Sequence, residues 1–223
     1  MNQENQKNAE VISKVLNQEF GNINVDQAKI LDVCCGVYDK SGTNYDEKGE
    51  IYEPTVAQNL AEIGYSVTGL DLRENKTQGD KDLTQGDKFG VVDDKNIYLK
   101  YTHRSDINII EENWSQKLVK DWNVIIFLRS LDTPEILLHY QKTFDIDDLN
   151  LLSLEIAKIY FPIFAELLKP NGLFFTTDIC NYSLCDDEFE TQLYQNQVNQ
   201  LFQKNGFSFI YASDGLSWFR KIF

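Results

Sequence analysis

The chain has 223 residues, of which 42% are hydrophobic and 13% aromatic, so it is long enough to fold as one large α/β domain around a buried core. Its formal net charge is −14 at pH 7, and no run of four basic residues occurs. Nucleic-acid binding depends on Lys and Arg neutralising phosphates, so this charge argues against a polynucleotide partner and equally against an anionic membrane surface.

The sequence predicts neither a membrane span, nor an export signal, nor a metal centre. No stretch approaches 18 consecutive apolar residues, and residues 1–10 are polar where a signal peptide would carry an apolar core. The four cysteines have no further Cys or His at zinc-ligand spacing. We therefore expect a cytoplasmic protein with reduced thiols, whose partner is a small neutral or cationic molecule or another protein.

Hydrophobic periodicity predicts helices and strands in alternation. The predicted helices cover residues 4–19, 54–63, 148–168 and 187–204. The predicted strands cover residues 29–35, 66–71, 97–101, 123–128, 173–177, 207–212 and 216–223. A Ser-Asp-Gly turn joins the last two strands and indicates a hairpin. The order predicts a single domain over 1–223, with a helical N-terminal extension over 1–28 and a doubly wound, mostly parallel, seven-stranded α/β sheet that ends in a C-terminal antiparallel β-hairpin.

Two long segments rich in Gly, Asp and Asn interrupt this alternation, at residues 37–52 and 73–96. The second contains the sequence TQGDK twice, at residues 77–81 and 84–88. Each segment follows a strand at the sheet edge where α/β proteins bind ligands, so we interpret both as long loops over a site. The alternative for the repeat is a solvated surface loop with a chance duplication.

The first two predicted strands both lead into carboxylates and small residues. The first contains Asp32 and continues into Cys34 and Gly36, and the second ends on Asp71. A tight turn after the first strand lets a ligand approach the backbone, and an acid after the second can accept both ribose hydroxyls. The pattern predicts a nucleoside site. The alternatives are that Gly36 is needed only for a backbone conformation with positive φ, and that Asp71 merely caps the next turn.

These residues resemble the motifs of class I S-adenosylmethionine-dependent methyltransferases. Asp32, Cys34 and Gly36 stand where that family has an acid and the first two small residues of its Asp-x-Gly-x-Gly-x-Gly turn. Tyr38 replaces the third glycine, which is a departure from the family pattern. Residues 167–172, Leu-Leu-Lys-Pro-Asn-Gly, are similar to the family's turn before its fifth strand.

The resemblance implies S-adenosylmethionine as cofactor and S-adenosylhomocysteine as its product. It assigns Asp71 to the ribose hydroxyls, Asp106 and Ile107 to the adenine, and Leu72 to the cofactor pocket in general. Leu128, at the end of the fourth predicted strand, belongs to the same implied pocket. Asp106 has a second interpretation from the residues alone, as the N-cap of a helix over 107–113. Cys34 is interpreted as a small turn residue in preference to a nucleophile.

In the family, the loop after the fourth strand faces the transferred methyl group. Here that loop contains the candidate catalytic residues Arg129 and Asp132. Arg129 can hold a substrate carboxylate or pair with a local acid, and Asp132 can act as a base. His103 and His139 are the other candidate bases. The motifs of amino-group and cytosine-C5 DNA methyltransferases are absent from the sequence.

The resemblance therefore predicts an enzyme that transfers methyl to oxygen, nitrogen or carbon of a small-molecule acceptor. Tyr38 and Tyr52 are candidates for the wall of the acceptor pocket. The alternative is a non-catalytic protein of the same fold that keeps the cofactor pocket and acts by binding or regulation. A dinucleotide oxidoreductase is the weaker third hypothesis, because its Gly-x-Gly-x-x-Gly turn is missing. The sequence determines neither the acceptor nor the oligomeric state.

Overall fold

The computed structural model describes nine segments of the chain: residues 4–21, 28–34, 55–70, 87–88, 101–104, 106–128, 134–177, 188–213 and 216–223. They belong to two compact units, Met1–Asn108 and Ile109–Phe223. The single-domain organisation stays a prediction. Among the described residues, no helix combines the length and the hydropathy needed to cross a bilayer.

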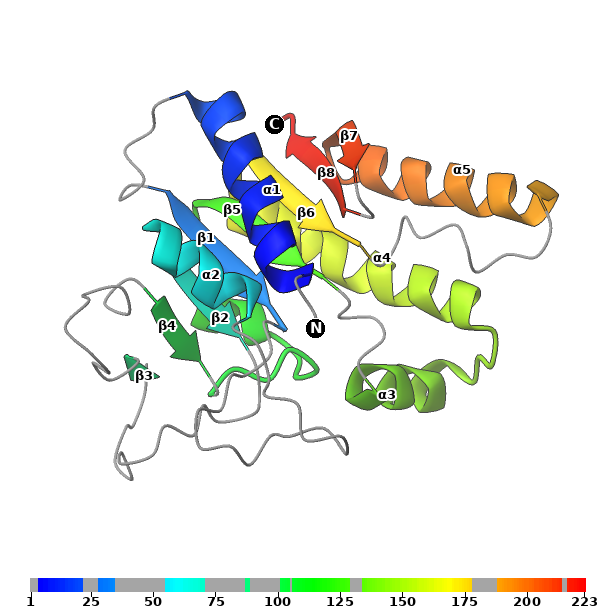
Figure 1. Ribbon diagram of the computed structural model, residues 1–223. Helices are drawn as coiled ribbons and strands as arrows, with labels where there is room; N and C mark the ends of the chain where they lie inside the picture. Colours follow the sequence, from blue (N-terminus) through cyan, green and yellow to red (C-terminus); the bar gives the residue numbers. More distant parts are fainter. Residues whose placement is uncertain are drawn as a thin grey trace, which may run out of the picture. The chain divides into compact units, whose positions relative to one another are not determined.

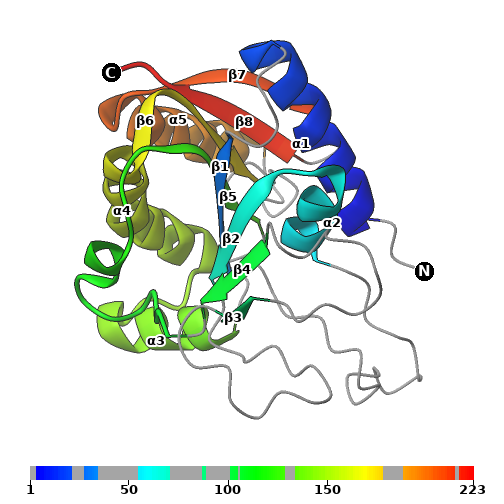
Figure 2. The ribbon, with the colours of Figure 1, turned by 90° about the vertical axis from the view of Figure 1, so that its left-hand side faces the viewer.

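The first unit is a small, largely parallel sheet with two helices. Its helices are α1 (Glu4–Phe20) and α2 (Val56–Ile63), and its strands are β1 (Lys29–Val33), β2 (Ser66–Leu70), β3 (Asp87–Lys88) and β4 (Tyr101–Arg104). The strand order is β3-β4-β2-β1, with β1, β2 and β4 parallel and β3 antiparallel to β4. Figure 2 shows β4, β2 and β1 side by side, while α1 lies beside α2 (Figure 1).

Helix α2 begins and ends on residues that satisfy its free backbone groups. The Thr55 hydroxyl accepts a hydrogen bond from the backbone N–H of Gln58 at 3.2 Å, and the Gln58 side chain accepts one from the N–H of Thr55 at 2.9 Å. This reciprocal capping box pairs two of the N–H groups that a helix start leaves unpaired. Gly64 ends the helix with φ 115°, a backbone conformation that favours glycine. The helix was predicted to begin at Pro54, which lies outside the described residues. In the structure Thr55 is the N-cap and the helix begins at Val56.

Helix α1 covers the first unit with the apolar stripe that its sequence predicts. Ile12, Val15 and Leu16 are buried, as expected for side chains three and four positions apart on one helix face. A polar contact accompanies this packing, because the Ser13 hydroxyl lies 3.3 Å from the hydroxyl of buried Tyr65. Tyr65 directly precedes β2, so α1 is tied to the beginning of a central strand of this unit.

The second unit combines a parallel pair with an antiparallel hairpin. Its elements are η3 (Trp114–Lys117), β5 (Trp122–Phe127), α3 (Pro134–Phe144), α4 (Leu149–Leu167), β6 (Leu168–Thr176), α5 (Glu188–Lys204), β7 (Phe207–Ser213) and β8 (Leu216–Lys221). The strand order is β5-β6-β8-β7, so the last strand in the sequence lies between two earlier ones. Strands β5 and β6 are parallel, whereas β8 is antiparallel to both β6 and β7.

The core of the second unit is mainly aromatic. Phe202 on α5 stacks on Phe219 of β8 with ring centroids 3.6 Å apart, and Phe161 on α4 lies 4.5 Å from Phe202. Such ring pairs contribute about 0.5–1.5 kcal/mol each beyond their area burial. Tyr160 is fully buried, and its hydroxyl donates to the backbone carbonyl of Ile109 at 3.1 Å. The polar atom of this large side chain is thereby satisfied inside the core.

Lys221 at the end of β8 closes the C-terminus of α4. Its Nζ donates to the backbone carbonyls of Ala165 and Leu168, at 2.5 and 2.6 Å. The last carbonyls of a helix have no partner within the helix and carry partial negative charge, so a cation is well suited to them. The same helix begins at Asp148, whose carboxylate accepts from the N–H of Leu151 at 2.9 Å.

The predicted fold class is confirmed, with local corrections. The predicted third strand begins at Tyr101 and continues to Arg104, while residues 97–100 lie outside the described part. Helix α3 was not predicted, although Pro134 at its first position is a typical helix start. The short β3 lies within the predicted loop 73–96, so the described strands number eight instead of seven.

The segment before the fifth predicted strand also differs from expectation. Residues 169–172 were expected to form a turn before this strand, but they form the irregular beginning of β6, where the pairing with β5 shifts register. Asn171 has φ 63°, and a Cβ added to Gly172 would meet the Lys169 carbonyl oxygen at 2.9 Å. This close approach explains why glycine occupies position 172.

Replacing Thr55 by Ala should lower the free energy of unfolding by about 1 kcal/mol, because the N-cap hydroxyl is lost and the Gln58 N–H loses its partner. Thr55→Ser keeps the hydroxyl and is the matched control. Urea denaturation of the three proteins measures the difference. An alanine variant as stable as the serine variant would contradict the capping role.

Candidate functional site

The parallel strands of the first unit end in a row. Val33 of β1 is paired with Leu70 of β2, and Leu70 is paired in turn with Arg104 of β4. Adjacent strands lie about 4.8 Å apart, so the ends of β1 and β4 are separated by about 10 Å, with β2 between them. Ligands of open α/β sheets bind outside such carboxyl ends. This row of three strand ends is therefore the candidate nucleoside-binding edge.

Cys34 forms the turn that directly follows β1. Its φ is +61°, in the left-handed region that costs a non-glycine residue about 1–2 kcal/mol. The family that this sequence resembles has glycine at the matching position, and this backbone conformation is one that glycine adopts without that cost. The Cys34 side chain is partly exposed. The interpretation as a small turn residue is thus consistent with the backbone.

Asp32 lies inside the sheet, one residue before the end of β1. Only 3% of the residue is exposed, and its position in the ladder is opposite Gly69 of β2. A buried carboxylate is costly unless other groups compensate its charge, and Asp32 does have an interaction partner. Its predicted contact with a cofactor stays a prediction.

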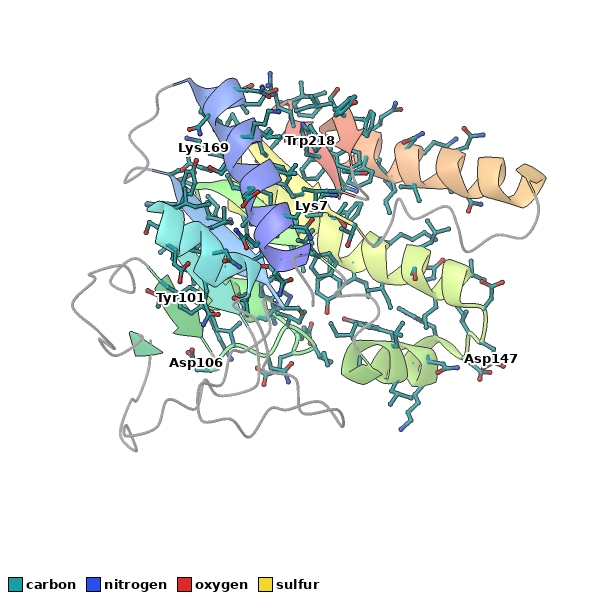
Figure 3. The ribbon with its side chains drawn as sticks, in the orientation of Figure 1. Lys7, Tyr101, Asp106, Asp147, Lys169 and Trp218 are labelled. Atoms are coloured by element: carbon teal, nitrogen blue, oxygen red, sulfur yellow. The ribbon has the colours of Figure 1, made fainter. Side chains whose placement is uncertain are left out.

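Arg104 and Asp106 form a two-pronged ion pair at the end of β4. The Arg104 Nε donates to Asp106 Oδ1 at 2.6 Å, and Nη2 donates to Oδ2 at 2.7 Å. Figure 3 shows Asp106 beyond the arrowhead of β4, at the opposite end of the strand from Tyr101. The side chains are 27% and 37% exposed, so the pair lies at the surface of the edge. We name it the Arg104–Asp106 fork.

The ion pair with Asp106 shifts the pKa of the Arg104 guanidinium. The hydrogen bonds to Asp106 raise the pKa of Arg104 above its ordinary value, with further help from the carboxylate charge, while partial burial opposes the increase. The two-pronged geometry gives the pair directional specificity as well as energy, so it holds the carboxylate in one orientation.

Ile107 follows the fork and is only 1% exposed. The alternative interpretation of Asp106 as a helix N-cap is wrong, because residues 107–113 form turns and irregular backbone, and the next helix is the short η3 from Trp114. The Asp106–Ile107 pair thus combines an accessible carboxylate with a buried apolar neighbour. This is the arrangement that the resemblance assigns to the adenine.

The remaining candidate residues fall outside the edge or outside the described residues. Those outside the described residues are Gly36, Tyr38, Tyr52, Asp71, Leu72, Arg129 and Asp132. Leu128 belongs to the second unit, where it follows β5 and is partly exposed. His103 is on β4, and His139 is exposed on α3. In the part of the chain that the structure describes, no group of three or more His, Cys, Asp or Glu could hold a metal ion.

Sequence reasoning missed Arg104. The signal that could have found it is the spacing Arg-x-Asp at a strand end, because residues two apart in an extended chain lie on the same side. Thr176 at the end of β6 was missed as well. Its hydroxyl is fully buried without a hydrogen-bond partner among the described residues.

No protein-family model matches this chain, and no curated protein matches it in sequence. Its structure is similar to solved methyltransferases. The antibiotic-resistance methyltransferase Kmr has a TM-score of 0.50 at 10% identity, over 93% of this chain and 91% of Kmr. Magnesium protoporphyrin IX methyltransferase (ChlM) from Synechocystis PCC 6803 with bound SAM has a TM-score of 0.48 at 14% sequence identity, and the match covers 96% of this chain and 79% of ChlM. The 1,6-didemethyltoxoflavin-N1-methyltransferase of Burkholderia thailandensis has a TM-score of 0.47 at 13% sequence identity, and the match covers 99% of this chain and 79% of that enzyme. The likeness to Kmr, which covers more than nine-tenths of both chains, shows that this chain has a methyltransferase fold.

The left-handed backbone at Cys34 generates a stability prediction. Cys34→Gly should leave the free energy of unfolding within about 1 kcal/mol of the wild type, because relief of backbone strain offsets the greater entropy of glycine in the unfolded chain. Cys34→Val should be clearly less stable than Cys34→Gly, since a β-branched residue is a genuine outlier at positive φ. Urea denaturation compares the two variants. Equal stability would contradict a constraint from the turn.

Proposed function

We propose that this protein binds S-adenosylmethionine at the candidate nucleoside-binding edge and transfers its methyl group to a small-molecule acceptor. The single observation that carries the proposal is the row formed by the ends of β1, β2 and β4, with the left-handed turn at Cys34 on one side and Asp106–Ile107 on the other. The methyltransferase fold supports it independently.

The residues at the edge suit the nucleoside part of this cofactor. The turn at Cys34 brings backbone close to a ligand lying across the strand ends. Asp71 follows β2 directly in the sequence, and we assign it to the two ribose hydroxyls. Asp106 offers a carboxylate for an N–H donor of the adenine, and Ile107 supplies the apolar flank.

The bound cofactor supplies an electrophilic methyl group on a sulfonium sulfur. The protein must then hold the acceptor in line with the methyl and remove a proton where the acceptor carries one. We assign the first task to Arg129 and the second to Asp132, both in the segment after β5. The long loops 37–52 and 73–96 would cover the acceptor, with Tyr38 and Tyr52 at its side.

The charge of the protein supports a small acceptor in place of a nucleic acid. The net charge of −14 and the lack of basic runs leave little to neutralise phosphates. The antiparallel β8, which lies between β6 and β7, supports a methyltransferase over a dinucleotide oxidoreductase, whose sheet is mostly parallel. Cofactor binding without turnover on any acceptor would favour the non-catalytic protein instead.

Isothermal titration calorimetry with S-adenosylhomocysteine, S-adenosylmethionine and NAD tests the proposal. We expect micromolar binding of the first two, which corresponds to about −8 kcal/mol, and no binding of NAD. The absence of heat with either adenosyl compound at millimolar concentration, together with a clear response to NAD, would refute the proposal. Methyl transfer to a panel of small acceptors then tests the enzymatic step.

The variant Asp71→Ala should weaken S-adenosylhomocysteine about ten- to a hundredfold, because a two-pronged, charge-assisted contact to the ribose contributes roughly 1.5–3 kcal/mol. Glu62→Ala, which removes an exposed carboxylate from α2 in the same unit, is the control for the change in charge and should bind like the wild type. If both variants bind equally well, Asp71 is only a turn residue.

A further inference from the structure

We infer that the face formed by α5, β7 and the last residues of the chain is the contact surface between two copies of this protein. All of these residues belong to the second unit, whereas β1, β2 and β4 of the candidate site belong to the first. The proposed function neither requires nor excludes this contact, so the two can be tested separately. A groove, an exposed apolar patch and the distribution of charge support a second copy as the partner.

Helix α5 packs against β7 (Figure 1), and a groove with a volume of about 450 Å³ is lined by residues of α5, β7 and β8. Asn199 and Gln203 of α5 contribute amide groups to it. Three rings of the aromatic core also line it: Phe202, Phe207 and Phe219. None of the described residues that line the groove is charged. An apolar centre with a few uncharged polar groups at its side is the composition of the centre of a protein–protein interface.

Exposed apolar side chains continue from this groove to the last residue of the chain. Phe209 and Ile222 line the groove and are each 54% exposed, and Phe223 is 78% exposed. Phe223 lies over Gly206, the residue before β7, because a Cβ added to Gly206 would lie 3.2 Å from its ring. We name Phe209, Ile222 and Phe223 the C-terminal patch.

The area of the C-terminal patch suits the centre of an interface. Large apolar side chains bury about 150–250 Å² each, so the three together expose roughly 350 Å². Contiguous apolar patches of about 300–600 Å² on a protein surface are often functional. A stable interface takes about 800 Å² from each partner, so the patch would supply its apolar centre and the amides of α5 part of its rim.

Charge favours a second copy as the occupant. Residues 191–213, which span most of α5 and all of β7, contain no Asp or Glu, although the whole chain has 35 of them. Lys204 is the one charged residue in this range. Two molecules of net charge −14 repel each other, and the repulsion is weakest where the touching surfaces carry no carboxylates. A strongly charged partner would meet few opposite charges here, whereas a two-fold axis sets the same uncharged patch against itself.

The place of β7 in the sheet adds to the exposure of this face. Among the described strands, β7 is paired only with β8, and its sequence contains neither a charged residue nor a proline. Proteins commonly protect a sheet edge with such residues or with a bulge. Here the pairing with β8 shifts register between Phe209 and Tyr211, which interrupts a regular ladder. We therefore expect the two copies to meet through the side chains of the C-terminal patch, and not through continuous pairing of their β7 strands.

Analytical ultracentrifugation of the full chain over a range of concentrations measures the contact. The variants Phe209→Glu and Ile222→Glu each place a carboxylate in the C-terminal patch, so a symmetric dimer would have to bury two of them. The control is Leu138→Glu on α3 of the same unit, because Leu138 is also 54% exposed and the same charge is introduced. Melting temperatures are compared at a concentration at which the wild type is monomeric.

We expect the wild type to form a dimer with a micromolar dissociation constant. Each glutamate in the patch should raise this constant about thirtyfold or more, as changes at the centre of an interface do, whereas Leu138→Glu should dimerise like the wild type. Raising the salt concentration from about 0.05 M to about 0.5 M should strengthen the dimer, because salt screens the repulsion between the two chains and no ion pair is lost. All melting temperatures should stay close to that of the wild type.

Three outcomes would overturn the inference. A wild type that stays monomeric up to its highest soluble concentration would leave the groove to a different protein or to a small ligand. A dimer that tolerates both Phe209→Glu and Ile222→Glu would place the contact elsewhere. A dimer that weakens as salt is added would show an ionic contact in place of an uncharged one. If Phe209→Glu lowers the melting temperature because its ring packs on Phe219, Ile222→Glu decides the question.

Discussion

The parallel pairing of β1, β2 and β4 is the constraint on which the candidate site depends. Parallel strands that are paired in register end at the same edge of the sheet. The backbone pairing alone therefore brings together residues from three distant parts of the sequence. The turn at Cys34 and the Arg104–Asp106 fork are the two described features of this edge. Helix α1 contacts the residue just before β2, because the hydroxyl of Ser13 lies close to that of Tyr65.

The two units solve different physical problems. The first unit has short strands and carries polar side chains at their carboxyl ends, where the orientation of a side chain matters more than its volume. The second obtains its cohesion from aromatic rings on α4, α5, β6 and β8, and its few buried polar atoms are mostly satisfied, as at Tyr160. The unpaired Thr176 hydroxyl is the exception among the described residues. A candidate site at the strand ends of one unit and an aromatic core in the other are consistent with the general rule that α/β folds bind ligands at strand ends.

Most of the architecture was predictable because hydrophobic periodicity reports burial. Helix α4 and strand β5 are apolar enough that their type and approximate bounds follow from the sequence. The end of β4 was not predicted, since Thr102 and Arg104 are polar and their place in the strand depends on pairing with neighbouring strands. Helix α3 was missed, although Pro134 at its first position is a typical helix start. Cys34 was interpreted as a turn residue before its φ was known, whereas the partner of Asp106 depends on side-chain geometry that residue types alone do not determine.

The place of β8 in the second unit has a consequence for how the chain is made. Strand β8 follows β7 in the sequence, yet it separates β7 from β6, and its Lys221 satisfies the end of α4. During synthesis, α4, β6, α5 and β7 all leave the ribosome before the strand that joins them. The facing edges of β6 and β7 and the last carbonyls of α4 therefore have no partner until β8 has been made. Unpaired strand edges make incomplete chains prone to aggregation, so this unit is most exposed to that hazard just before its synthesis is finished.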